Sequence, residues 1–340
     1  MKSLHSLLLF LLAGLCPIFF PTMADEITVY SHRHYPSDDV LFEKFTEQTG
    51  IRVRVVKAGA DELIERLRAE GDNTRADVLI TADAGRLHIA KTAGLLLPLE
   101  SEILTESIPE PYRDPDNTWF GFTLRARVMI YAKDRVQAGE LTTYEDLANR
   151  KWRGRLLARS SSHIYNQSLL ASMIAAHGEA EALAWARAVR GNLARAPQGS
   201  DRDQMRAVAR GLADVAIVNT YYLGLMHNSP DPQDRELAGR LAVHFPNQED
   251  RGIHVNVSGG GVIKASRRPE QAQKFLEFLV SEEAQKTFPL TTSEFPVVEG
   301  IELSDLQKSW GAFKADTLNL GKLGDLNVTA VRLFNMSGWE

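Results

Sequence analysis

Two adjacent tyrosines, Tyr221 and Tyr222, follow an apolar run of strand type that ends in Asn219-Thr220. Phenolate oxygen is a hard anionic donor that suits a small trivalent cation such as Fe³⁺, whereas thiolates suit softer metals. A phenol with a pKa of about 10 ionises at neutral pH only beside a strong Lewis acid. At the first turn of a helix the two side chains diverge by roughly 100°, so both can lean toward one ion. Taken alone, such a doublet is more often a packing feature, so the hypothesis of a metal clamp needs further ligands.

Further donors stand in loops that follow predicted strands. Tyr35 and His34 come after the first strand, and Tyr165 stands in a serine-rich loop before a predicted helix. Four phenolates on one Fe³⁺ leave one excess negative charge, for which Arg33 and Arg125 are candidate counter-charges. His34 is a candidate fifth ligand, because a neutral imidazole adds no charge. The simpler alternatives are that the ring of Tyr165 caps the core and that Arg125 pairs with a carboxylate.

These loops need a frame that brings them together. Alternating β-branched segments predict strands over 26–31, 51–56 and 77–81. The amphipathic segments between them predict helices that begin after Ser37 and at Asp61. This βαβαβ order implies a parallel sheet with right-handed crossovers. Ligands of such sheets bind outside the carboxyl ends of the strands, which is where the first tyrosine loop lies.

The second half of the chain also alternates predicted strands and helices, with less regular spacing. The pattern predicts crossing strands over 119–124 and 128–131, a short strand over 156–158, helices over 167–190 and 201–211, and a strand over 214–219. The run Gly259–Gly261 predicts a tight turn. It is no phosphate-binding P-loop, because no Lys-Ser/Thr follows it.

The length and the net charge of the chain limit which classes of protein it can belong to. A chain of 340 residues is longer than one core usually holds, so two domains are expected. We predict a first lobe from residues 25–122 plus 250–300 and a second lobe from 123–249 plus 301–340. The formal net charge of −5 argues against nucleic acid or an anionic membrane as the main partner.

The segment 1–24 predicts a cleaved signal peptide. It has a positive start, an apolar stretch over 7–16 and small residues at the cleavage position. A transmembrane helix is less favoured, because the apolar stretch is short and is followed by Pro17 and Pro21. Cleavage would remove Cys16, the only cysteine. We therefore expect an exported periplasmic protein without disulfides or thiolate metal sites.

The sequence resembles the periplasmic ferric-iron-binding proteins of ABC importers over nearly the whole mature chain. The resemblance lies in four stretches: EITVYSHRHY at 26–35, ADVLITADAG at 76–85, NTYY at 219–222 and HVNVSGGGV at 254–262. In that family the paired tyrosines bind Fe³⁺, which implies this role for Tyr221 and Tyr222, and a histidine matches His34. Tyr35 and Tyr165 match the tyrosine-rich subgroup, which includes the cyanobacterial-type proteins.

Another group of the family uses a carboxylate in the loop after the third strand, together with a synergistic anion. This chain has Ala82 at that place, and Asp83 stands one residue further on. The need for a carbonate-like anion therefore stays open. Candidate residues to hold such an anion are Arg125, Ser160, Ser161 and Ser162.

The resemblance implies an α/β fold of the class II periplasmic-binding-protein type, a two-lobed clamshell with two crossing hinge strands. It also implies Fe³⁺ as the transported ligand and an ABC permease with its ATPase in the inner membrane as partners. We expect a monomer. The alternative is a binding protein for an organic solute or oxyanion, such as a polyamine, a sugar or thiamine, with tyrosines that stack. An enzyme is not predicted, because ligand transfer needs no covalent chemistry. A third hypothesis, an exported hydrolase, is disfavoured because neither a Gly-x-Ser-x-Gly elbow nor a His-Glu-x-x-His motif occurs.

Overall fold

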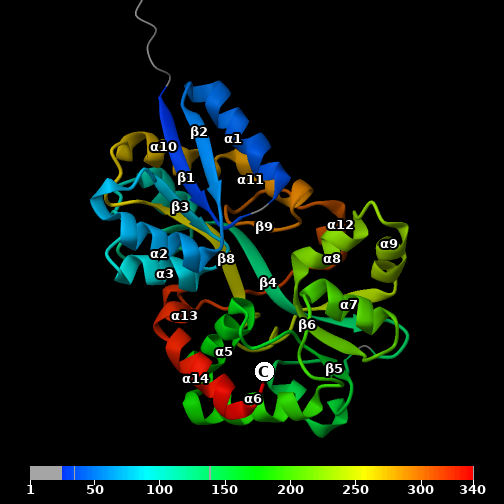
Figure 1. The fold of residues 1–340 in the computed structure, drawn as a ribbon. Coiled ribbons are helices and arrows are strands. Elements are labelled where there is room, and N and C mark those ends of the chain that lie inside the picture. Colours follow the sequence, from blue (N-terminus) through cyan, green and yellow to red (C-terminus); the bar gives the residue numbers. More distant parts are fainter. Residues whose placement is uncertain (1–24, 34, 138, 340) are drawn as a thin grey trace, which may run out of the picture.

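The computed structural model describes residues 25–33, 35–137 and 139–339. Figure 1 shows this part of the chain folded into two lobes that extended strands join. The predicted signal peptide and His34 lie outside the described residues. In the described ranges, no helix is both long and apolar enough to cross a bilayer.

The described strands form one mixed sheet in the order β2-β1-β3-β8-β4-β6-β5, with β7 and β9 also paired to β4. The strands are β1 (Glu26–Ser31), β2 (Arg52–Lys57), β3 (Val78–Thr81), β4 (Phe120–Ala132), β5 (Leu156–Leu157), β6 (Val215–Asn219), β7 (Leu241–His244), β8 (Val255–Val262) and β9 (Phe295–Pro296). The helices are α1 (Pro36–Thr49), α2 (Ala60–Glu70), α3 (Ala84–Thr92), α4 (Glu102–Ser107), α5 (Ile164–His177), α6 (Glu179–Asn192), α7 (Asp201–Ala209), α8 (Thr220–His227), α9 (Pro232–Gly239), α10 (Pro269–Leu279), α11 (Glu282–Thr291), α12 (Asp305–Ser309), α13 (Gly321–Asp325) and α14 (Asn327–Ser337).

The first lobe is built on three parallel strands, as the βαβαβ pattern predicts. β1 pairs with β2 in the register Glu26↔Arg52 and with β3 in the register Val29↔Val78. α1 forms the crossover between β1 and β2 and buries Phe45 in the core. The carboxyl ends of β1 and β3 therefore meet at one edge of the sheet, and the loop with Tyr35 leaves from this edge.

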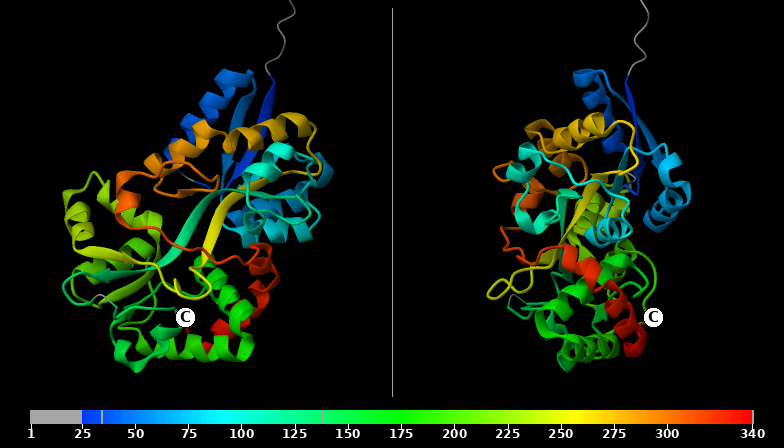
Figure 2. Two further views of the ribbon diagram at one scale, coloured as in Figure 1. Left: turned by 180° about the vertical axis from the view of Figure 1, so that it is seen from behind. Right: turned by 90° about the vertical axis from the view of Figure 1, so that its left-hand side faces the viewer.

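β4 and β8 pass between the two lobes side by side, which Figures 1 and 2 both show. β4 pairs with β8 from Phe120 to Ala126 and with β6 from Arg127 to Tyr131, so its two halves belong to different parts of the sheet. The segments 119–124 and 128–131, predicted separately, are thus one continuous crossing strand. The predicted pair of crossing hinge strands corresponds to β4 and β8.

The prediction of a tight turn at Gly259–Gly261 is wrong, because these glycines lie inside β8. Two neighbouring strands approach them closely on both sides. On the β4 side, a Cβ atom on Gly259 would collide with the carbonyl oxygen of Phe120, and one on Gly261 with that of Thr118. On the β3 side, a Cβ atom on Gly260 would collide with the carbonyl oxygen of Leu79. The glycines allow neighbouring backbones to approach an interior strand closely. In the sequence alone, such a glycine run looks the same as a tight turn.

The second lobe departs from the prediction at its long helix. The segment predicted as one helix over 167–190 is two helices, α5 and α6. They are separated by Gly178, whose φ of +82° lies outside the helical region and suits glycine. α5 begins at Ile164, three residues earlier than predicted, so Tyr165 belongs to its first turn.

The C-terminal helices lie against both lobes. α13 packs against α3 and α5, and α14 packs against α5 and α6. His88 of α3 lies 2.8 Å from the carboxylate of Asp325 in α13. Trp339 is buried and donates its indole N–H to the carbonyl oxygen of Arg159 at 3.2 Å. The predicted lobe boundaries, which assign 301–340 to the second lobe, remain a prediction.

Candidate metal site

The tyrosines stand at the first turns of three helices. Tyr35 is the N-cap residue of α1, directly before Pro36. Tyr165 is the second residue of α5, and Tyr221 and Tyr222 are the second and third residues of α8, directly after β6. α8 follows β6 directly, whereas α1 and α5 follow β1 and β5 after short loops, so each ring stands beyond the carboxyl end of a strand.

The structure brings these four side chains together. The phenol oxygens of Tyr165 and Tyr221 lie 3.2 Å apart, within hydrogen-bonding distance. The ring of Tyr35 meets that of Tyr221 edge-on, with 6.2 Å between the ring centroids. The rings of Tyr221 and Tyr222 are 4.1 Å apart, centroid to centroid. Tyr35 comes from the first lobe and the other three from the second, so the cluster lies between the lobes.

Burial makes these phenols poor acids in the absence of a cation. Burial, followed by the negative charges of Glu294 and the neighbouring phenols, raises the pKa of Tyr35 well above its usual value. Burial and the other phenols raise the pKa of Tyr221 in the same way, and burial also raises the pKa of Tyr222. Tyr35, Tyr221 and Tyr222 therefore hold their protons until a strongly polarising cation displaces them.

Arg125 lies among these rings and is almost fully buried. Its guanidinium carbon is 5.6 Å from the ring centroid of Tyr165. Its Nη2 donates to the carbonyl oxygens of Ala82 and Val257, and its Nε lies 3.7 Å from Glu294. Within the described ranges, Nε and Nη1 have no hydrogen-bond partner. These buried N–H groups can donate hydrogen bonds to a small anion or stabilise the negative charge of a phenolate.

Arg33 lies beneath Tyr35, and its charge is already balanced. Its guanidinium carbon is 4.8 Å from the ring centroid of Tyr35. Its Nε and Nη2 donate to the carboxylate of Asp38 at 3.0 Å each, and its Nη1 donates to Glu294 at 2.7 Å. Two carboxylates on one guanidinium leave no spare positive charge, so Arg33 is suited to hold the ring in place.

Sequence reasoning missed a buried polar network behind the tyrosines of the second lobe. Arg127 donates to Asp201 at 2.8 Å, and the backbone N–H of Asn219 donates to the same carboxylate at 3.2 Å. Arg127 also donates to the side chains of Asn166 at 2.6 Å and Asn219 at 3.2 Å. These asparagines stand beside Tyr165 and at the start of α8. The network thus ties both helix starts to β4.

A signal for this network exists in the sequence. Arg125 and Arg127 are two residues apart in an apolar strand, so both point to the same face. Two arginines on one face of a buried strand indicate a charged site there, because unpaired buried charges are costly.

The surplus charge around the tyrosines is positive. Arg125, Arg127 and Arg159 lie 5.6, 5.9 and 5.8 Å from the ring centroid of Tyr165. Arg202 lies 5.9 Å from the ring of Tyr222, and Arg33 lies below Tyr35. The carboxylates that pair with these five arginines are Asp38, Asp201 and Glu294. Positive groups exceed negative ones here, as the excess negative charge of a ferric tetraphenolate requires.

The serines predicted to hold an anion, and Asp83 after the third strand, lie near the ends of α5 and α3. Ser160 and Ser162 share a hydrogen bond of 2.9 Å between their hydroxyls, and Gln167 donates to the carbonyl oxygens of Ser161 and Ser162. They form the loop before α5, and an anion-binding role stays a prediction. Asp83 is fully buried and caps α3, with Ser168 and Asn256 also donating to it. Its carboxylate is therefore occupied away from the tyrosines.

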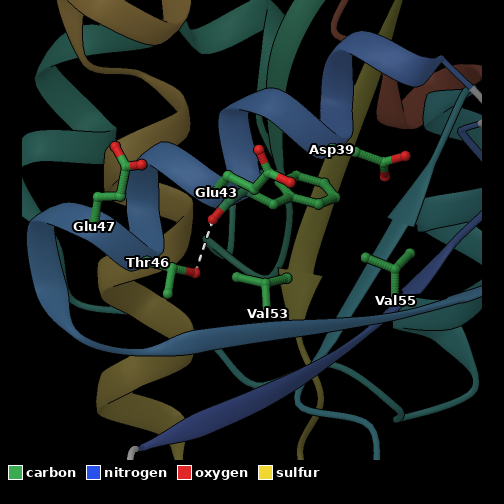
Figure 3. Close-up of a pocket in the computed structure, with 7 residues that line it drawn as sticks. Asp39, Glu43, Thr46, Glu47, Val53 and Val55 are labelled. Carbon is green, nitrogen blue, oxygen red and sulfur yellow. Dashed lines mark hydrogen bonds between the residues drawn. The ribbon is translucent and has the colours of Figure 1, made fainter.

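Carboxylates offer no competing metal site. In the described part of the chain, no three His, Cys, Asp or Glu residues are arranged to hold a metal ion. Figure 3 shows a groove between α1 and β2 that is lined by Asp39, Glu43 and Glu47 over Val53 and Val55. Its carboxylates are spread along α1, while the tyrosines gather at the start of that helix.

The chain belongs to the bacterial extracellular solute-binding proteins, whose family model matches residues 41–315. It is 49% identical over 320 residues to Iron uptake protein A1 of Synechocystis, covering 94% of this chain and 89% of that protein. It is 28% identical to the Major ferric iron-binding protein of Neisseria meningitidis, covering 84% and 85%. A Trichodesmium protein solved with iron and citrate ligands superimposes with a TM-score of 0.90 at 47% identity, covering 93% of this chain and 100% of that one. These likenesses confirm the predicted fold class and the resemblance to ferric-iron-binding proteins.

Proposed function

We propose that this protein captures Fe³⁺ in the cleft between its lobes and delivers it to an ABC permease for iron uptake. The ligands are the phenolates of Tyr35, Tyr165, Tyr221 and Tyr222, with His34 as a candidate fifth ligand. The observation that carries this proposal is the convergence of four tyrosines from three helix starts on one point.

The donor set selects the type of ion. Hard phenolate oxygens favour Fe³⁺ over soft cations, and a trivalent ion can displace protons from phenols whose pKa burial has raised. Stacking of an organic solute would instead need exposed ring faces. The faces of Tyr221 and Tyr222 lie against each other and against arginines, which disfavours that alternative.

The route of delivery follows from the family. Solute-binding proteins of this kind work outside the inner membrane, so we place the protein in the periplasm after removal of residues 1–24. Its partners are the permease and the ATPase of an ABC importer, and it acts as a monomer. Capture and release need no covalent chemistry, so no catalytic activity is proposed.

Closure about β4 and β8 would bring Tyr35 and the second-lobe tyrosines onto one ion. A small anion, carbonate-like or citrate-like, would complete the coordination sphere. Arg125 is the candidate to hold it, because its Nε and Nη1 are buried without a partner in the described part of the chain.

The test mixes the iron-free protein with ferric citrate and desalts the mixture. Iron held by phenolates gives a red-orange charge-transfer band, and the band should be lost when Tyr221 and Tyr222 are both replaced by Phe. Tyr131→Phe is the matched control, because Tyr131 lies on β4 at a distance from the cluster, where it pairs with Val215. A colourless protein without retained iron, or a full band in the double variant, would overturn the proposal.

A further inference from the structure

A pocket of about 590 Å³ lies at the amino ends of the first-lobe strands. Its lining includes four arginines, Arg54, Arg75, Arg267 and Arg268, two carboxylates, Glu26 and Asp77, and the polar residues Thr28, Asn73 and Thr74. Figure 1 shows the arrows of β1 and β2 pointing from this end toward the middle of the molecule. A strand of six residues spans about 20 Å, so the pocket and the tyrosine cluster lie at opposite ends of the sheet.

The sheet register explains how distant residues meet here. Arg54 of β2 stands opposite Thr28 of β1, and Thr28 also lines the pocket. Arg75 precedes β3 by three residues. Because β8 runs antiparallel to β3 with Val262 opposite Val78, the segment after β8 returns to the same end and brings Arg267 and Arg268 there.

These four guanidinium groups have no ionic partner among the residues that the structure describes. Throughout the described ranges, the side chains of only seven arginines lack a hydrogen bond, ion pair or ring contact: Arg54, Arg75, Arg150, Arg153, Arg210, Arg267 and Arg268. Four of the seven line this one pocket. In a chain with a net charge of −5, four arginines against the two carboxylates that line the pocket are a local excess of positive charge.

The two carboxylates of the pocket, Glu26 and Asp77, have other partners than the four arginines. Asp77 is buried and accepts from the backbone N–H of Thr28 at 2.8 Å and from the hydroxyl of Ser266 at 2.7 Å. Glu26 lies 3.7 Å from Arg52. The acidic groove of Figure 3 lies on the other face of β2, because Val53 and Val55 point into that groove while Arg54 alternates to the opposite face.

We propose that this arginine pocket is a second binding site, separate from the iron cleft, for an anion that carries a phosphate group. Guanidinium groups match phosphate oxygens in a bidentate fashion, and four of them from three separate segments can surround one phosphate or two linked phosphates. Asn73 and Thr74 add polar groups to the rim. A soluble phosphate ester and a phospholipid headgroup share this chemistry.

The test uses the full-length mature protein without iron, at low ionic strength. One arm titrates inorganic phosphate and glycerol 3-phosphate by calorimetry. The other arm measures flotation with vesicles of phosphatidylglycerol and phosphatidylcholine, and with vesicles of phosphatidylcholine alone. Arg267→Gln/Arg268→Gln should weaken binding by at least about tenfold. Arg54→Gln/Arg75→Gln should do the same from two other elements.

The matched control is Arg150→Gln/Arg153→Gln, which removes the same charge from two exposed, unpartnered arginines of the second lobe. It should leave binding unchanged, and all variants should keep full ferric-iron loading. Binding of the soluble esters identifies a free phosphate compound as the ligand source, and binding of phosphatidylglycerol vesicles alone identifies a lipid headgroup. Absence of binding in both arms, or an equal loss in the control variant, overturns the proposal.

Discussion

The phenol oxygens of Tyr165 and Tyr221 lie 3.2 Å apart, although the two residues are separated by 56 positions in the chain. They stand at the starts of α5 and α8, and each start follows a strand of the second lobe. Two phenols this close can share a proton or jointly bind one cation. Arg125, Arg127 and Arg159 surround Tyr165, so the pair lies next to positive charge that can balance the negative charge of metal-bound ligands.

Replacement of Tyr165 by Phe should remove one ligand and keep the fold. The loss of its hydrogen bond to Tyr221 should cost about 1 kcal/mol of stability in the iron-free protein. Ferric affinity should fall by about 100-fold or more, since even partners outside the coordination sphere contribute 10–100-fold. Competition with citrate measures the affinity, and Tyr131→Phe is the control. Unchanged affinity in Tyr165→Phe would exclude it as a ligand.

Arg125 should contribute to ferric binding through its charge. Arg125→Met removes the buried cation that interacts with three of the phenols, so the excess negative charge of the ferric site loses one of its balancing positive charges. Ferric affinity should fall by about 10–100-fold, the range typical of groups that support metal ligands. Arg125→Lys should recover part of the loss, because it restores charge without the planar fork. Equal affinities of the Met variant and the parent protein would show that other arginines balance the site.

Arg127 should hold the second-lobe tyrosines in place through Asp201. Arg127→Met leaves the buried carboxylate of Asp201 with the backbone N–H of Asn219 and, as its remaining ionic partner among the described residues, Arg159 at 3.6 Å, so the iron-free protein should lose about 3–5 kcal/mol of stability. The double variant Arg127→Met/Asp201→Leu should lose less than the two single variants together. Arg135→Met breaks a more exposed ion pair with Asp214 and should cost about 1 kcal/mol or less. Additive losses in the double variant would contradict the coupling.

The sequence predicted the parts of this site that local patterns encode. The strand ends, the helix starts and the doublet Tyr221-Tyr222 follow from periodicity, and their common edge follows from the parallel sheet. The partners of Arg33 could not be predicted in this way, because Glu294 stands 261 positions away and reaches it only through the packing of the segment after α11. Likewise the glycines of β8 resemble a turn until the neighbouring carbonyl groups of Phe120 and Thr118 are in place.

Stability should fall in mild acid because His254 is buried and has no carboxylate partner among the described residues. Burial, aided by the positive charges of Arg127 and Arg251, lowers the pKa of His254 to about 3. Between about pH 6.5 and pH 3, the histidine is protonated in the unfolded chain, where its pKa is about 6.5, and stays neutral in the folded chain. The free energy of unfolding therefore keeps its full value above about pH 6.5 and declines as the pH falls toward 3. At about pH 5 the loss from this group should be about 2 kcal/mol.

Urea unfolding of the iron-free protein at about pH 7.5 and about pH 5 measures this effect. His254→Asn carries no titratable group at this position, so its stability should decline less between the two pH values. An equal decline in the variant would assign the acid sensitivity to other groups, such as His227 and His244, whose pKa values burial also lowers.

Glycine at position 261 should be required by the close pairing of the crossing strands. In Gly261→Ala the new methyl group would meet the carbonyl oxygen of Thr118 and the side chain of Leu96, so the strands must separate. The expected cost is about 1–3 kcal/mol. Gly191→Ala is the control, because Gly191 is exposed in α6 and a Cβ atom there meets nothing within 4 Å. This control should gain about 0.4–1 kcal/mol, since alanine lowers the entropy of the unfolded chain and favours the helix. Unfolding midpoints that move in the same direction in both variants would contradict a packing role for Gly261, and with it the explanation given for the glycine run in β8.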